Sequence, residues 1–281
     1  MAHGQQKIAF QGTEGAYSDL VCRRLYPDAA VLPCASFEDV FAAMQRGNAS
    51  HAVIPLENSI AGRVADVHTL LPKSGLFITG EHYEKITHNL LVLPGTKADA
   101  IKDVHSHVQA LSQCRDYLRA QGFSPVVHSD TAGAARDVSY WKNPRNAAIA
   151  SSLAAEIYGL EILQRDIADA AHNTTRFVVL ERSARTPEYV SGKSYKTTLY
   201  FTLRNVPAAL YKALGGFATN GINLCKIESY LSGGSFQAAE FFVEVEGHPE
   251  TEAFRNALQE LEFYSSALSI LGVYPKGETS F

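Results

Sequence analysis

The feature that most constrains the fold is an alternation of two patterns along the first two thirds of the chain. Short apolar runs typical of strands alternate with stretches in which apolar residues recur with a helical period. This order predicts α/β sheets that are largely parallel. Strands are predicted at residues 7–10, 30–33, 52–55, 76–79, 89–93, 125–128, 147–150 and 177–180, and helices at 17–25, 37–45, 109–120, 132–140 and 153–158. Ser36, followed by Asp39, predicts an N-cap for the second of these helices.

The order of elements changes after residue 182. Residues 183–195 are polar and have no apolar period, which predicts a linker. Residues 196–275 then give strand, helix, strand, strand, helix and strand, with a turn at the glycine pair 233–234. This is the order of a ferredoxin-like unit (βαββαβ), which we interpret as a ligand-sensing or assembly module.

Composition excludes several classes of partner. The 281 residues include 25 basic and 29 acidic side chains, and the basic ones form no block or stripe. We therefore expect no nucleic-acid partner. No apolar run approaches the roughly 18 residues of a membrane span, and the N-terminus has no secretory pattern, so we expect no membrane partner and a cytoplasmic location. The four scattered cysteines predict reduced thiols. His105 and His107 have the spacing of strand ligands, but no cysteine or carboxylate cluster stands nearby, so we expect no metal.

Four polar stretches lie at predicted strand–helix joins, at residues 12–18, 55–63, 106–114 and 172–177. In open α/β sheets, ligands bind beyond the carboxyl ends of the strands, where helix N-termini favour anions. Each stretch also has a purely structural interpretation: a tight turn at Gly12 and Gly15, an N-cap at Glu57, Asn58 and Ser59, and half a capping box at Ser106 and Gln109.

Arg176 is the sharpest of these signals, because it stands at the head of an apolar strand beside Thr174 and Thr175. Arginine is almost never buried without a partner. An exposed edge position is one explanation, and an anion-binding site is the one that we favour.

Together these stretches resemble the prephenate dehydratase family. The motifs are GTEGAYS, PLENSIAG, SHVQALSQC, AAIASSLAAEIYGLEIL and the Asn-x-Thr-Arg-Phe signature that ends in TRF, in this order, and the resemblance extends over residues 7–275. Val108 departs from the family, which usually has proline there. The tail is similar to the ACT domain that is fused to that enzyme.

The resemblance implies an architecture. The catalytic domain, residues 7–182, would be a two-lobed, type II periplasmic-binding-protein-like fold. Lobe one would comprise residues 7–85 and 167–182, and lobe two residues 86–166. The strand that follows Asn173 would lie beside residues 7–10. The linker, 183–195, would lead to the ACT regulatory domain, 196–275.

The resemblance also implies a carbon–oxygen lyase (hydro-lyase) that converts prephenate to phenylpyruvate, water and carbon dioxide without a cofactor. It assigns proton donation to Thr175. Arg176 would bind a carboxylate, mainly at the pyruvyl end, through two parallel hydrogen bonds, and Phe177 would pack beside the ring. Asn58 and Ser59 are the other expected catalytic residues. The remaining expected substrate contacts are Gly12, Thr13, Gly15, Ala16, Glu57, Ser106, Gln109 and Thr174.

The ACT resemblance further implies feedback regulation by L-phenylalanine at an interface between two chains of a homodimer or homotetramer. The residues at the family's two motifs and beside them are Ala208, Ala209, Leu210, Asn223, Leu224, Glu228 and Ser229. Three positions depart from the family: Ala208 replaces a usual glycine, and Tyr230 and Leu231 replace a usual Arg-Pro.

Three alternatives stay open at this point. The substrate could be arogenate, or both compounds could be substrates of a dual-specificity cyclohexadienyl dehydratase. A two-lobed solute-binding protein would share the fold but would normally carry a secretory signal. A chain that ends near Ser191 should fold and retain dehydratase activity, because the first 182 residues hold every catalytic motif.

Overall fold

The computed structural model describes residues 6–231 and 238–278, and these fall into two compact units. Unit 1 contains the described residues up to Val67 together with His82–Phe177. Unit 2 contains His68–Glu81 and Val178–Glu278. The division falls within two strands, β5 (Phe77–Lys85) and β11 (Thr174–Glu181).

The first lobe of unit 1 is a sheet whose strand order is β5-β11-β3-β1-β2. Strand β1 pairs in parallel with both β2 and β3. We expected β11 beside β1, but β3 lies between them, because β1 already has a partner on each side. The elements of this lobe not yet given are β1 (Lys7–Gln11), α1 (Tyr17–Leu25), β2 (Ala30–Cys34), α2 (Phe37–Gln45), β3 (His51–Asn58), β4 (Gly62–Arg63) and the start of α3 (Ala65–Leu70).

The second lobe is a separate five-stranded sheet with the order β10-β6-β9-β7-β8. Strand β7 is parallel to β8 and β9, whereas β6 is antiparallel to β9 and β10. Its elements are β6 (Asn89–Val92), η2 (Ala98–Ala100), β7 (Asp103–His107), α4 (Val108–Gln113), α5 (Arg115–Gln121), β8 (Ser124–His128), α6 (Thr131–Trp141), β9 (Asn146–Ala150), α7 (Ser152–Tyr158) and β10 (Glu161–Gln164).

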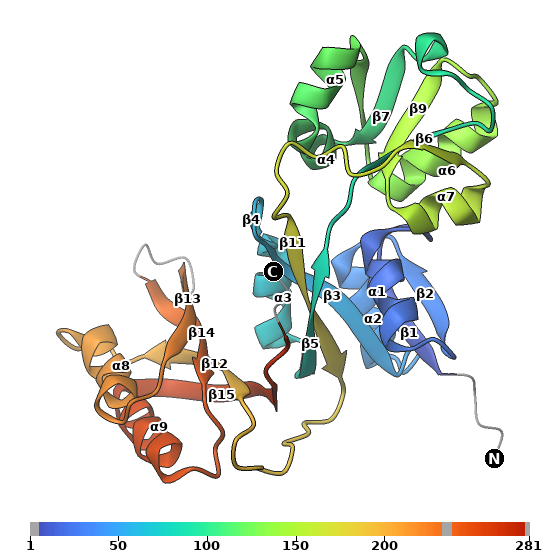
Figure 1. Ribbon diagram of the computed structural model, residues 1–281. Helices are drawn as coiled ribbons and strands as arrows, with labels where there is room; N and C mark the ends of the chain where they lie inside the picture. Colours follow the sequence, from blue (N-terminus) through green and yellow to red (C-terminus); the bar gives the residue numbers. More distant parts are fainter. Residues whose placement is uncertain (1–5, 232–237, 279–281) are drawn as a thin grey trace, which may run out of the picture. The chain divides into compact units, whose positions relative to one another are not determined.

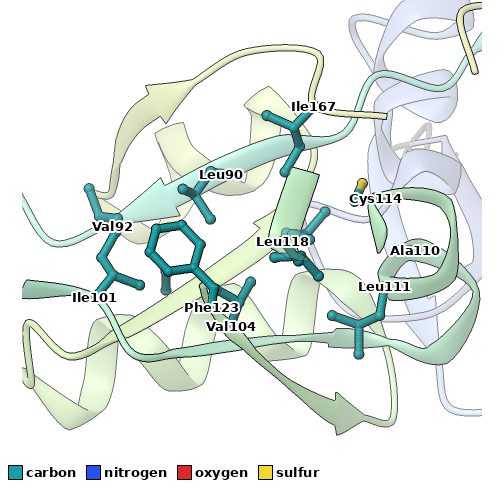
Figure 2. Packing of buried hydrophobic residues seen from close by; sticks show 12 residues of the cluster. Leu90, Val92, Ile101, Val104, Ala110, Leu111, Cys114, Leu118, Phe123 and Ile167 are labelled. Carbon is teal, nitrogen blue, oxygen red and sulfur yellow. The ribbon is translucent and has the colours of Figure 1, made fainter. Parts of the chain in front are cut away.

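Helices cover both faces of this second sheet, with α4 and α5 on one face and α6 and α7 on the other (Figure 1). Successive side chains of a strand point to opposite faces. Leu90 accordingly packs under α4 and α5, beside Leu118 and Phe123 (Figure 2). Leu91 packs against the alanine-rich α6 and α7. This double burial explains why β6 (NLLV) and β9 (NAAIA) are nearly continuous apolar runs.

Unit 2 contains the predicted βαββαβ order, and its sheet has the strand order β13-β14-β12-β15. The N-terminal half of β5 joins this sheet, where Ile78 lies opposite Gly272. Its other elements are η1 (Leu71–Lys73), β12 (Tyr195–Leu203), α8 (Ala209–Thr219), β13 (Leu224–Leu231), β14 (Ala238–Glu246), α9 (Glu252–Tyr264) and β15 (Ser265–Pro275).

The predicted fold class is confirmed: unit 1 has the two-lobed, type II periplasmic-binding-protein-like fold, and unit 2 contains a ferredoxin-like fold. The predicted turn at residues 233–234, and the first residues of the strand expected after it, lie outside the described residues. The predicted domain boundaries stay predictions. Among the described residues, no helix is long and apolar enough to span a membrane.

Candidate active site

Unit 1 contains a cavity of about 520 Å³ whose wall is built by both lobes. It lies where β1, β3 and β7 end and where β11 begins, which is the edge that open α/β sheets use for ligands. Its polar lining comes from Gln11, Tyr17, Ser18, Asn58, Arg63, Asp66, His88, His107, Gln109, Gln113, Ser129, Asp130, Thr131, Asn173 and Thr175.

Strand β11 sends alternate residues of the Thr-Arg-Phe motif to opposite sides. Thr175 and Phe177 line the cavity, whereas Arg176 is 3% exposed and is not among the lining residues. The Arg176 guanidinium donates to Glu57 Oε1 at 2.8 Å. Neither Arg176 nor Glu57 is among the lining residues, and the expected contact of both with the substrate stays a prediction.

Asn58, the last residue of β3, fixes the position of the Thr175 hydroxyl. Its Oδ1 accepts the backbone N–H groups of Ile60 and Ala61, at 3.0 and 2.8 Å. Its Nδ2 therefore points the other way and donates to Thr175 Oγ1 at 2.9 Å and to Asn173 Oδ1 at 2.7 Å. Since Oγ1 is an acceptor in this contact, the hydroxyl proton of Thr175 remains available to a ligand.

The turn between β1 and α1 contributes Gly12 and Ala16 to the cavity wall. Gly15 packs closely against the second lobe instead. Its φ is +89°, and a Cβ at this position would lie 2.9 Å from the Ala154 Cα of that lobe. Thr13 donates to Asp130 Oδ2 at 3.4 Å. Thr13 and Gly15 thus connect the turn to the second lobe, and neither is a lining residue.

Three more of the expected contact residues hold the backbone instead. The Ser59 hydroxyl donates to His172 O at 2.8 Å and accepts the Thr174 N–H at 3.0 Å. Ser106 is fully buried and donates to Ile149 O at 2.6 Å. Ser59, Ser106 and Thr174 do not line the cavity, whereas Gln109 does.

The site residues predicted from the sequence omit much of the wall, including Tyr17, His88, Gln113 and Asn173. Tyr17, Gln113 and Asn173 lie inside the polar stretches that the sequence analysis singled out, but nothing in their spacing marks them. Tyr17 begins a helix, and His88 lies between two strands. Burial raises the pKa of Tyr17 and lowers the pKa of His88, so the phenol stays protonated and the imidazole is neutral near neutral pH.

The charges in the wall are few. Within the lining set, all of it in the described part of the chain, Arg63 is the one arginine or lysine, and Asp66 and Asp130 are the carboxylates. Across residues 6–231 and 238–278, no three histidine, cysteine or carboxylate groups are placed to hold a metal ion. The cavity therefore offers an oriented hydroxyl, several amide groups, one guanidinium and the ring of Phe177 to a small anionic ligand.

Comparisons with known proteins agree with this site. A family model described as prephenate dehydratase matches residues 8–185, which include every lining residue. The bifunctional N-acyl-homoserine lactone acylase/prephenate dehydratase of Komagataeibacter europaeus is 49% identical over 273 residues, which are 97% of this chain and 97% of that protein. Arogenate dehydratase/prephenate dehydratase 2, chloroplastic, of Arabidopsis thaliana is 37% identical over 282 residues, with coverages of 97% and 74%.

A solved structure gives the same result. Prephenate dehydratase from Arthrobacter aurescens, in complex with L-Phe, is 30% identical, has a TM-score of 0.87, and is matched over 96% of this chain and 90% of that one. The chain therefore belongs to the prephenate dehydratase family and is a hydro-lyase of that family.

Proposed function

We propose that the chain converts prephenate to phenylpyruvate, water and carbon dioxide, a step of L-phenylalanine biosynthesis. The observation that carries this proposal is the Thr175 hydroxyl, which lies in the cavity and accepts a hydrogen bond from Asn58 Nδ2. Both residues lie in the segment that matches the family model. A held hydroxyl is the group that this reaction needs, because hydroxide is a poor leaving group and must depart as water.

The balanced reaction places each proton and electron pair. The Thr175 hydroxyl donates its proton to the ring hydroxyl as the carbon–oxygen bond breaks. The bond between the ring and its carboxylate also breaks. Its electron pair stays on the ring and completes the aromatic system, and the carboxylate leaves as carbon dioxide. Solvent then returns one proton to Thr175, so one proton is consumed per turnover. The Asn58 N–H favours the oxyanion that develops on Thr175.

The two substrate carboxylates need different surroundings. We assign the pyruvyl carboxylate to Arg63, in place of Arg176, because Arg63 is the guanidinium of the lining set. The ring carboxylate must lose its charge, and a tight cationic grip on it would stabilise the ground state. Phe177 and Ile86 of the cavity wall provide a less polar place for it.

The test is to follow phenylpyruvate formation from purified prephenate, with phenylalanine formation from arogenate measured in parallel. Arogenate is the alternative substrate, favoured by the 37% identity to an arogenate dehydratase/prephenate dehydratase. We expect turnover of prephenate and a lower kcat/KM for arogenate. Turnover of arogenate alone would mean that arogenate, and not prephenate, is the substrate. Turnover of neither compound would overturn the proposal.

A second candidate function is hydrolysis of N-acyl-homoserine lactones, which is suggested by the name of the relative that is 49% identical over 97% of both chains. The cleaved bond would be an amide, and water would be the second reactant. Release of homoserine lactone from an N-acyl-homoserine lactone, measured with wild type and with Thr175→Ala, tests it. Loss of both activities in the variant would place them in one cavity, and no release by wild type would eliminate this candidate.

Unit 2 is proposed to be an ACT domain that binds L-phenylalanine, with residues 196–275 as its extent and 7–182 as the catalytic domain. Support comes from the L-Phe complex of the Arthrobacter aurescens relative. The expected ligand residues fall at the start of α8, where Ala208 has a φ of +59°, and along β13, which holds Leu224, Glu228 and Ser229. Strand β13 ends the sheet, so a second chain could complete the site and form a homodimer or homotetramer.

Calorimetric titration with L-phenylalanine, combined with the dehydratase assay and light scattering, tests this regulation. We expect heat of binding, inhibition and a change in oligomeric state. A coupling free energy of about 1–3 kcal/mol is usual for such regulation. No heat and no change in rate at millimolar ligand would leave unit 2 as an assembly module only.

A further inference from the structure

A continuous chain of side-chain hydrogen bonds runs through the wall of the cavity. Tyr17 Oη lies 3.0 Å from His88 Nδ1, and His88 Nε2 lies 2.7 Å from Gln113 Oε1. Asn173 Nδ2 donates to the same Gln113 oxygen at 2.9 Å. Asn173 is in turn bonded to Asn58, which donates to the Thr175 hydroxyl. The chain thus connects Tyr17 of α1 to the group that is proposed to protonate the substrate.

The direction of every bond in this chain follows from its Asn58 end. Two backbone N–H groups fix Asn58 Oδ1, so its Nδ2 is the donor to Asn173 Oδ1. Asn173 must then donate through Nδ2, which makes Gln113 Oε1 an acceptor. The imidazole nitrogen that faces this oxygen must carry a proton, and His88 is therefore the Nε2–H tautomer.

The Tyr17 end is compatible with the same tautomer. Burial lowers the pKa of His88, so the ring is neutral near neutral pH, and with the proton on Nε2 its Nδ1 is an acceptor. Tyr17 Oη lies within hydrogen-bond distance of two acceptors, this Nδ1 at 3.0 Å and Thr87 O at 2.8 Å, and its single proton can be donated to either. Thr87 O also accepts Asn89 Nδ2 at 3.2 Å, so it keeps a donor when the phenol donates to His88.

The members of the chain come from both lobes and from the segments that join them. Tyr17 and Asn58 belong to the first lobe, and Gln113 is the last residue of α4 in the second lobe. His88 and Asn173 lie in the two connections between the lobes, which are bonded to each other through Ile86 N and Asn173 O at 2.8 Å. With its oxygen held by two donors, Gln113 turns its amide nitrogen away from them.

We propose that Tyr17 and His88 are positioning residues for the dehydratase reaction. They hold Gln113 with its NH₂ group toward the cavity, where it donates to a substrate oxygen, and they complete the array that ends at the Thr175 hydroxyl. This inference rests on the proposed function in so far as it concerns turnover. The orientation of the imidazole can be tested without any substrate.

The first experiment compares two variants of the same residue. A glutamine side chain places its amide near the position of imidazole Nε2, and an asparagine side chain near that of Nδ1. His88→Gln keeps a donor for Gln113 Oε1 and should stay within about threefold of the wild-type kcat, whereas His88→Asn should lose on the order of 10²-fold. The same two substitutions at His105, which lies outside the cavity lining, serve as controls and should not differ from each other.

The second experiment records ¹⁵N spectra of the imidazoles in the full chain, with His88→Gln used to assign the His88 signals. We expect a protonated, pyrrole-type Nε2 and an unprotonated, pyridine-type Nδ1 in wild type, with Tyr17→Phe moving both signals toward their averages. An Nδ1–H tautomer, or equal activity of the glutamine and asparagine variants in an active enzyme, would overturn the inference. Failure of wild type to turn over prephenate or arogenate would instead remove the proposed function and leave the tautomer result intact.

Discussion

At the scale of single residues, the Thr175 hydroxyl carries the proposed acid chemistry. Thr175→Ala removes one hydroxyl and no backbone bond, and general acid catalysis contributes about 10²–10⁴-fold, so we expect kcat to fall by that amount. Thr175→Ser keeps the hydroxyl and should keep part of the activity. Steady-state kinetics measure both variants, and circular dichroism checks that they fold. An alanine variant with wild-type kcat would end the assignment.

The second residue-scale prediction concerns Arg176, whose side chain is 4% exposed and is paired with Glu57. Lysine cannot reproduce the planar fork of the guanidinium. Arg176→Lys should therefore lower the free energy of unfolding by about 1–3 kcal/mol, since it weakens a charge-assisted hydrogen bond that a buried guanidinium makes. Urea unfolding measures this loss. The variant should have a nearly unchanged KM, and a large rise in KM without loss of stability would restore the original expectation of substrate contact.

The third prediction follows from the lowered pKa of His88, caused by burial and opposed by the Gln113 hydrogen bond and by Asp166. Below the ordinary pKa of about 6.5, the unfolded chain binds a proton that the folded chain does not. Stability must therefore fall as pH drops through that window, by at most about 1.4 kcal/mol per pH unit for one group.

His88→Gln removes this titration and should flatten the pH dependence of the unfolding free energy below about pH 6.5. Urea unfolding of both proteins across this range measures the difference. Identical slopes would mean that His88 keeps an ordinary pKa in the folded chain.

At the scale of elements, helix α2 shows how a local signal fixes a boundary. Ser36 was predicted as its N-cap, and the structure confirms this: Ser36 Oγ accepts the Asp39 N–H at 3.1 Å. Ser36→Ala should lower the unfolding free energy by about 1 kcal/mol, and Ser36→Gly by only a few tenths. Thermal or urea unfolding of the pair tests it, and an alanine variant as stable as wild type would show that the cap contributes nothing.

Other elements depended on contacts that local pattern does not contain. The helix expected at residues 109–120 is two helices, α4 and α5, because Cys114 leaves the helical conformation, with a φ of −117° and a ψ of 19°. Strand β7 was missed because its sequence, DVHSH, is largely polar. Its Val104 and Ser106 are buried by neighbours that are distant in the sequence.

Site residues could be predicted where they lie in a recognisable motif. They could not be predicted where they depend on contacts between segments that are distant in the sequence. Asn58, Gln109, Thr175 and Phe177 were expected and line the cavity. The alternation of a strand would have placed Arg176 on the other face, had it been applied to the motif. No local rule brings His88 to Gln113, because their contact depends on how the two connections between the lobes lie.

At the scale of the whole molecule, the division into units differs from the division by motifs. Residues 68–81 belong to unit 2, where Glu81 is fully buried and accepts from Lys196 Nζ at 3.0 Å and from Gly277 N at 2.8 Å. A chain that ends at Ser191 keeps the catalytic motifs but loses both of these partners. This finding argues against our expectation that such a chain would fold and retain dehydratase activity.

We predict that the shortened chain has a clearly lower unfolding midpoint and a reduced yield of folded protein. The shortened chain loses the strand beside β5, where Ile78 lies opposite Gly272, together with the Lys196 and Gly277 partners of Glu81. Scanning calorimetry of the full and the shortened chain decides it: equal midpoints would show that residues 68–81 do not need the C-terminal strands.

The central place of β11 also determines the order in which a nascent chain can fold. All five strands of the second lobe have been synthesised at residue 164, and its core residue Ile167 follows, but the sheet of the first lobe still lacks the strand between β3 and β5. Chains fold during synthesis at about 5–20 residues per second, and exposed strand edges invite wrong pairing. We therefore expect the sheet of the first lobe, although its first strands are synthesised first, to be completed only after the second lobe has folded.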